Sequence, residues 1–206
     1  MKISIDNYPQ AMSWETYYKL HESFITEHKT SGSNQSEDML HYTMLNWQRI
    51  KRIYHHTTFD DETTAQIMAL PHQNWLVITE AWCGDAAQSV PALAALAALN
   101  EKINLSIVFR DEQLELMDKF LTNGSRSIPV FIFINPETDE LIGQWGPRPA
   151  EAQKLLFTMR TAKSKDEDIK LELQKWYNKN KSEDMVKEVL QIISRDKRQL
   201  PQIPNA

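Results

Sequence analysis

The sequence is short of cysteine and has no long apolar run. Cys83 is the one cysteine among 206 residues, which excludes a disulfide within the chain and favours a reducing compartment. No apolar run approaches the ~18–20 residues that span a bilayer. The N-terminus "MKISIDNYPQ" lacks the basic region and apolar core of a signal peptide. We therefore expect a cytoplasmic protein without a membrane partner.

The chain also lacks a large excess of either charge. Its 23 Lys and Arg face 28 Asp and Glu, for a net charge of -5. That balance is ordinary for a globular protein and gives no basic footprint, so no nucleic-acid partner is expected. With 206 residues, 41% of them hydrophobic, one core with extensions is expected in place of two independent cores.

The N-terminal region, residues 1–72, has the spacing of amphipathic helices. Aromatic and apolar residues recur at three- and four-residue steps over 9–29, which predicts one helix. Ser36 can cap a second helix that carries the apolar residues of 40–54, and a short third helix ends at Pro71. We assign this region to a helical extension packed on the core.

The middle region, residues 73–160, changes to strand-forming patterns. Apolar, β-branched runs occupy residues 74–81, 103–109 and 128–134. An Ala/Leu-rich helix containing Pro91 separates the first two runs, and a helix over 111–124 separates the second and third. This alternation of strands and helices, with a short antiparallel strand at 141–146, indicates an α/β domain.

The C-terminal region, residues 161–206, returns to helix. One helix is expected over 149–180, with the charged stretch 163–168 as a kink or a solvated face. Ser182 can cap a last helix, and residues 199–206 form a loosely held tail.

The segment "TEAWCGDAAQSV", Thr79–Val90, places Cys83 between a strand and a helix. The unpaired N–H groups and positive dipole of a helix start favour thiolate over thiol. Gly84 permits close approach of another chain, Trp82 can shield the sulfur, and Asp85 can favour the helix start. Because the charge of Asp85 also opposes thiolate formation, the sequence leaves the sign of the pKa shift open.

Residues 82–86, Trp-Cys-Gly-Asp-Ala, resemble the Trp-Cys-Gly-Pro-Cys-type site of the thioredoxin family, and Pro91 matches the kinking proline of its next helix. The stretch 126–133 resembles the family's cis-proline segment, and Gly-x-x-Gly at 143–146 matches the turn after its last strand. The resemblance covers roughly 73–160. It implies a thioredoxin-like fold, with a central mixed sheet, flanking helices and, here, N- and C-terminal helical extensions. Bacterial members of unassigned substrate share the Asp and an N-terminal helical extension.

The resemblance also implies a substrate platform. Pro129 would be the cis residue after Ile128 and would face Cys83, leaving the backbone of Ile128 free to pair with an extended peptide or a thiol-bearing tail. Trp82 would add specificity. Gly84 and Asp85 complete the predicted substrate-binding set.

The chain departs from the family pattern at two positions. Ala86 replaces the resolving cysteine, so the dithiol cycle cannot run. Val77 stands where the family has a buried acid. Glu80, three residues before Cys83, is the candidate for the missing proton relay, and the alternative is a merely solvated carboxylate at a strand end.

The leading hypothesis is a monothiol disulfide oxidoreductase. Cys83 would form a mixed disulfide with a disulfide- or thiol-bearing protein or a low-molecular-weight thiol, and an external thiol reductant would resolve it. A peroxide-reducing variant would pass through a sulfenic acid. No metal or organic cofactor is implied, because His55, His56 and His72 have no cysteine or carboxylate at metal-ligand spacing.

Other interpretations stay open. Loss of the resolving cysteine and the buried acid favours a non-catalytic thioredoxin-fold binding module that uses the groove between Cys83 and Pro129. Retention of Cys83 beside Trp82 and Gly84 argues for chemistry. An engineered Ala86 that traps a complex is a third interpretation, and a buried structural cysteine is the plainest one for Cys83.

Overall fold

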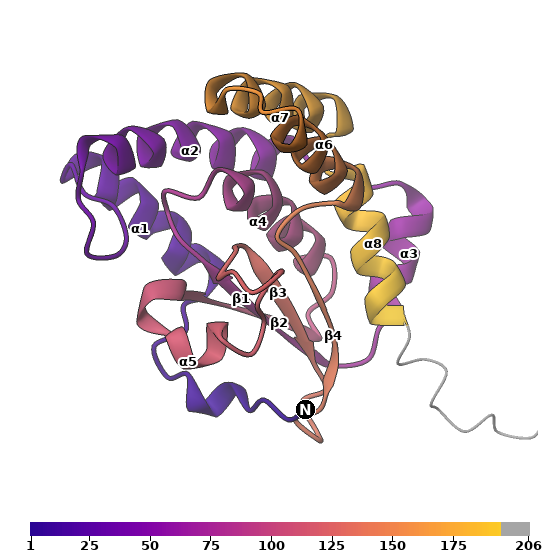
Figure 1. Ribbon diagram of the computed structural model, residues 1–206. Helices are drawn as coiled ribbons and strands as arrows, with labels where there is room; N and C mark the ends of the chain where they lie inside the picture. Colours follow the sequence, from indigo (N-terminus) through magenta and orange to yellow (C-terminus); the bar gives the residue numbers. More distant parts are fainter. Residues whose placement is uncertain (195–206) are drawn as a thin grey trace, which may run out of the picture.

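The centre of the structure, a computed structural model that describes residues 1–194, is a four-stranded mixed sheet (Figure 1). Its strands are β1 (Gln73–Thr79), β2 (Ile103–Phe109), β3 (Val130–Ile134) and β4 (Leu141–Trp145), in the spatial order β2-β1-β3-β4. β1 is parallel to β2 and antiparallel to β3, and β3 is antiparallel to β4. The α/β fold with a central mixed sheet is therefore confirmed.

The two central strands are the most apolar because both of their faces are covered. Every residue of β1 and of β3 is buried. Val77 of β1 lies between Ile107 of β2 and Phe131 of β3. Strands covered on both faces have continuous apolar sequences, which is the pattern of the first and third apolar runs.

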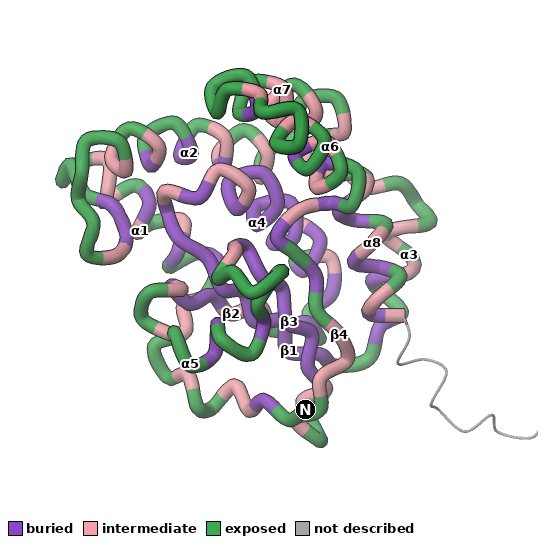
Figure 2. The backbone as a smooth tube through the Cα atoms, viewed as in Figure 1, coloured by how far each residue is buried: buried purple, intermediate pink, exposed green. Residues whose placement is uncertain are grey.

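Helices cover the sheet and one another. They are α1 (Trp14–Thr26), α2 (Glu37–His56), α3 (Asp61–Met68), α4 (Gly84–Ala97), α5 (Leu114–Met117), α6 (Ala150–Thr161), α7 (Asp166–Asn180) and α8 (Glu183–Ile193), with 3-10 turns at Ile5–Asn7 and Arg110–Glu112. α4 lies between the sheet and α2, and it is buried almost throughout (Figure 2). Its small Ala side chains let α2 pack closely. α8 packs on β4, with α3 beside it.

The N-terminal residues 1–72 pack on the core and also pair with the edge of the sheet. Met12 and Ile107 exchange two backbone hydrogen bonds, both of 2.8 Å. Tyr17 of α1 and Trp47 of α2 are buried in the same apolar core as the strands. The three helices follow the expected order.

The expected helix over 111–124 is wrong in its extent. The chain forms the 3-10 turn Arg110–Glu112 and the single-turn helix α5, followed by a turn in which Thr122 and Ser125 exchange backbone hydrogen bonds. Phe120 is 2% exposed, and its N–H bonds to the carbonyl three residues earlier. This 3-10-type tightening buries Phe120 at the cost of continuing the helix.

The expected single helix over 149–180 is two helices, α6 and α7. Lys163 has a φ of 55°, and the Ser164 N–H donates to the Met159 carbonyl at 3.0 Å. A left-handed residue with such a return bond ends a helix. The charged stretch 163–168 therefore contains a full break.

Ser182 precedes α8, but the expected side-chain cap is wrong. Its φ is 69°, and its hydroxyl donates to the Gln88 carbonyl at 3.4 Å. The left-handed backbone turns the side chain toward α4, and Asn180 accepts the Asp184 N–H in its place, at 3.2 Å. The expected tail at 199–206 lies outside the described residues.

Candidate functional site

Cys83 occupies the expected position between β1 and α4. It is the N-cap residue of α4, and its backbone N–H donates to the Glu80 carbonyl at 3.1 Å. The Ala86 N–H donates to Cys83 Sγ at 3.5 Å. The sulfur thus satisfies one of the unpaired N–H groups at the positive end of the helix.

The Ile128–Pro129 peptide bond is cis, as the sequence predicts. The Cys83 thiol donates to the Ile128 carbonyl, with a distance of 3.3 Å between sulfur and oxygen. Gly146 supports this loop, because its φ is 130° and a Cβ there would lie 2.1 Å from the Pro129 oxygen. The thiol therefore occupies the carbonyl that we expected to pair with an incoming peptide.

Burial and a neighbouring charge disfavour ionisation of the Cys83 thiol by raising its pKa. Its side chain is buried, with the residue 7% exposed, and burial raises the thiol pKa to about 12. The negative charge of Asp85 raises this pKa further, while the Ala86 N–H and the Arg148 charge oppose the shift. Desolvation and a like charge outweigh the helix start, which answers the question of sign that the sequence left open.

Asp85 is held in a polar network that the sequence does not reveal. Its carboxylate forms an ion pair with Arg148 at 2.5 Å and accepts a hydrogen bond from the Tyr177 hydroxyl at 2.8 Å. Burial raises the pKa of Asp85, whereas Arg148 and Tyr177 lower it. Asp85 therefore links the start of α4 to the loop before α6 and to α7.

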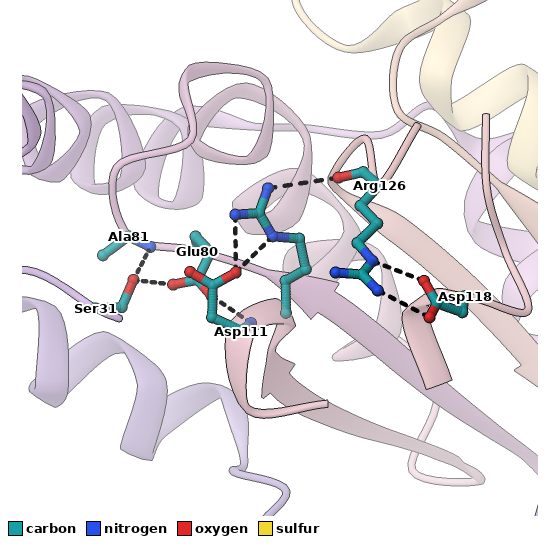
Figure 3. Close-up of polar contacts among 7 residues, drawn as sticks. Ser31, Glu80, Ala81, Asp111, Asp118 and Arg126 are labelled. Atoms are coloured by element: carbon teal, nitrogen blue, oxygen red, sulfur yellow. Dashed lines mark hydrogen bonds and ion pairs between the residues drawn. The ribbon is translucent and has the colours of Figure 1, made fainter. Parts of the chain in front are cut away.

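Glu80 is fully buried, so the interpretation as a solvated carboxylate is wrong. Its carboxylate accepts hydrogen bonds from the Ser31 hydroxyl and from the Asp111 N–H, the latter at 2.9 Å (Figure 3). Ser31 in turn accepts the Ala81 N–H at 2.8 Å. Among residues 1–194 no hydrogen bond joins the Glu80 carboxylate to Cys83. Glu80 anchors the N-terminal extension to the loop that carries the cysteine.

A pocket of about 580 Å³ opens beside the cysteine. Trp82, Cys83, Gly84, Asp85 and Ile128 all line it, so the structure brings these predicted site residues together. Neither Pro129 nor Glu80 is a lining residue. α6 and α7 supply the opposite wall, which the sequence did not predict because these helices follow the site by more than 60 residues.

Two further contacts shape the walls of the pocket. The Arg110 guanidinium lies 4.9 Å from the centroid of the half-buried Trp82 ring, a distance at which a cation is attracted to an aromatic face. Arg49 of α2 donates to Asn46 at 3.0 Å, and Asn46 donates to the Ala81 carbonyl at 3.0 Å. α2 therefore fixes both the loop backbone and a guanidinium beside it.

The described part of the chain shows no cluster of three His, Cys, Asp or Glu residues that could hold a metal ion. Within the same residues, no helix has the length and apolarity needed to cross a membrane.

Comparison with known proteins agrees with this geometry. The family described as Thioredoxin matches residues 32–165, which is more than half of the chain. This chain belongs to the thioredoxin family. The match includes α2, the cysteine loop, the cis-proline and α6, so the family extends into the N-terminal helices.

Solved structures similar to this thioredoxin-family chain show the fold alone. A Pseudomonas aeruginosa protein of unknown function has 16% sequence identity and a TM-score of 0.59, and the match covers 90% of this chain and 99% of that one. An HIV epitope scaffold has 17% identity and a TM-score of 0.56, with 89% and 98% covered. A search of curated proteins found no match.

Proposed function

We propose that this thioredoxin-family chain is a binding module, which holds its ligand in the pocket beside Cys83 without thiol chemistry. The observation that carries the proposal is the burial of the Cys83 thiol and its hydrogen bond to the Ile128 carbonyl. The thiolate is the nucleophile in disulfide exchange. Burial raises the pKa of the Cys83 thiol, so thiolate is disfavoured at pH 7.

The remaining parts of the dithiol machinery serve packing here. Ala86, at the position of the resolving cysteine, is 1% exposed and belongs to the apolar core. Val77, at the position of the buried acid, is fully buried between neighbouring strands. Replacing a thiol and a carboxylate by buried alkyl groups removes two groups that redox chemistry uses and leaves the fold intact.

The second candidate is the monothiol oxidoreductase, and one observation favours it. Cys83 lines the pocket, and its Sγ accepts the Ala86 N–H at the start of α4. In this reaction the thiol loses its proton and the sulfur attacks a disulfide, forming a mixed disulfide and releasing one thiolate, which takes up a proton. An external thiol then loses its proton and attacks the substrate sulfur of the mixed disulfide. The bond to Cys83 breaks, the Cys83 thiolate takes up a proton, and the substrate sulfur leaves in a new disulfide with the external thiol.

The rate of Cys83 alkylation by iodoacetamide, measured against pH, separates the two candidates. The binding module predicts slow alkylation of the folded protein, with an apparent pKa above the ~8.5 of a free cysteine, and ordinary reactivity in urea. The Cys83→Ser variant gives the background rate of alkylation at other residues. An apparent pKa below that of the unfolded chain would instead assign the chemistry to Cys83.

A further inference from the structure

The pocket beside Cys83 is cationic in a chain that is acidic overall. Its lining contains six cationic side chains, Arg49, Arg110, Arg126, Arg148, Arg160 and Lys170. The lining carboxylates are Asp85 and Asp166. The chain as a whole has a net charge of -5. Charge of one sign concentrated in a hollow raises the local concentration of ligands of the opposite sign.

Three of the six cations already have carboxylate partners. Arg148 pairs with Asp85, Arg110 with Asp111 and Arg126 with Asp118, the last through two hydrogen bonds of 2.7 and 2.9 Å (Figure 3). These pairs fix the walls and leave little net charge for a ligand.

The other three, Arg49, Arg160 and Lys170, form no ion pair within residues 1–194. Arg49 is half-buried, and burial together with the nearby Arg52 lowers the pKa of its guanidinium. Arg148, although paired, keeps a buried Nε–H that has no acceptor in the described part of the chain. A half-buried cation such as Arg49 and a buried unpaired donor such as the Arg148 Nε–H are costly unless a ligand satisfies them. Arg160 and Lys170 are exposed, and Lys170 also donates to the Tyr42 hydroxyl at 2.5 Å.

Size and apolar surface limit the kind of anion. The volume of about 580 Å³ lies within the ~300–1,000 Å³ typical of sites for small organic molecules. Trp82, Ile128, Ile169 and Leu173 give the pocket an apolar wall. A ligand that fits both features has an oxyanion at one end and an apolar body.

We propose that this pocket binds a small organic anion, with its carboxylate or phosphate group at Arg49, Arg160 and Lys170 and its apolar part against Trp82. This inference rests on the proposed binding function and names the chemistry of the ligand. Arg49 is the central contact, because it is fixed by α2, lies within 4 Å of the position a Cβ would take on Gly84, and forms no ion pair with any carboxylate that the structure describes. Arginine presents a planar fork that matches either oxyanion.

Isothermal titration of the full chain with citrate and with inorganic phosphate, at constant ionic strength, tests the proposal. We expect saturable binding of at least one probe with a Kd below about 1 mM, about tenfold weaker in Arg49→Gln and in Arg160→Gln. Lys154→Gln is the matched control, since Lys154 is an exposed cation of α6 outside the pocket. Binding of citrate alone assigns a carboxylate ligand, and binding of phosphate alone assigns a phosphate. Circular dichroism verifies that each variant is folded. If Arg49→Gln does not fold, Arg160→Gln carries the test, because Arg160 is exposed.

The anion site would be overturned if neither probe binds saturably, or if Lys154→Gln weakens probe binding as much as Arg49→Gln and Arg160→Gln do. Alkylation of Cys83 in the same samples keeps the two proposals apart. If Cys83 is unreactive and neither probe binds, only the anion site is overturned. A thiol with a depressed pKa and intact probe binding leaves the anion site standing and overturns the binding-module function.

Discussion

At the scale of single residues, three side chains decide the charge of the site. Cys83 and Asp85 are two positions apart in the loop, and the Asp85 charge raises the pKa of the thiol. Arg148 pairs with Asp85 at 2.5 Å and acts on the thiol in the opposite direction. The thiol therefore faces a nearly neutral pair, and burial is left as the dominant influence on its pKa.

Replacing Asp85 by Asn should make Cys83 more acidic. The substitution removes a like charge beside the thiol and leaves the Arg148 charge in place, so we expect alkylation at pH 8 about tenfold faster than in the wild-type chain. It should also lower the free energy of unfolding by about 2 kcal/mol, because a partly buried guanidinium loses its carboxylate.

Asp118→Asn is the matched control for this substitution. Its pair with Arg126 is about half exposed, and exposed pairs contribute ~0–1 kcal/mol. Urea unfolding and alkylation rates of both variants check the expectation. Slower alkylation in Asp85→Asn, or equal losses of stability in the two variants, would contradict the proposed role of Asp85.

At the scale of elements, α7 is a wall attached by polar side chains. Tyr177 donates to Asp85, and Gln174 accepts a hydrogen bond of 3.0 Å from Gln88 of α4. Left-handed residues at both ends, Lys163 and Lys181, separate α7 from its neighbours in sequence. Ile169 of α7 is buried as well, and loss of the polar bonds should lower the free energy of local opening of this helix.

Tyr177→Phe should loosen this wall. Loss of the hydrogen bond to Asp85 removes a charge-assisted contact worth about 1–2 kcal/mol, so amide hydrogen exchange in α7 should accelerate roughly tenfold. Exchange in β1 and β3 should stay unchanged. Tyr42→Phe, which removes the exposed contact with Lys170, should accelerate amide hydrogen exchange in α7 less. Equal exchange rates in wild type and Tyr177→Phe would show that the bond does not hold α7.

The interface between α1 and α2 contains a pH-sensitive residue. His21 of α1 is fully buried against Tyr17 and Trp47, and neither ring nitrogen has a hydrogen-bond partner among the residues that the structure describes. Burial lowers the pKa of His21 to about 3. In the unfolded chain a histidine takes up a proton near pH ~6.5. The unfolded state therefore binds more protons between these two values, and stability falls as the pH drops from 6.5 toward 3.

Wild type should accordingly lose about 2 kcal/mol more stability than His21→Phe between pH 7.5 and pH 5.0. Burial also raises the pKa of Glu80 and Asp85, so these carboxylates contribute in the opposite direction, equally in both proteins. Urea unfolding at the two pH values measures the loss of stability in each protein. If His21→Phe does not fold, His21→Leu takes its place. Identical pH dependence in wild type and variant would mean that His21 is protonated in the folded chain.

At the scale of the whole molecule, the sequence predicts the sheet and the cysteine loop because their signals are local. Apolar runs identify the strands, and the resemblance around Pro129 predicts the cis bond. The partners of Asp85 could not be predicted, because Arg148 and Tyr177 approach it only after α6 and α7 fold back over α4. The burial of Glu80 likewise depends on Ser31, which is 49 residues away in sequence.

The charge of the pocket, like the partners of Asp85, could not be predicted from the sequence. Composition gives a net charge of -5 and no sign of an anion site. The cations of the pocket come from α2, α6, α7 and the loops between other elements, and no two of them are neighbours in sequence. Only the fold brings these cations together around the cysteine, so no local sequence motif indicates the positive charge of the pocket.

The Cys83 thiol should stay protonated in the folded protein at neutral pH. Because Cys83 is the one cysteine of the chain, ¹³Cβ-labelled cysteine gives a single NMR signal whose chemical shift follows thiol ionisation directly. We predict no titration step between pH 6 and pH 10 in the folded protein and a step near pH ~8.5 in urea. A step in the folded protein below pH ~8.5 would contradict the account and identify Cys83 as an activated nucleophile.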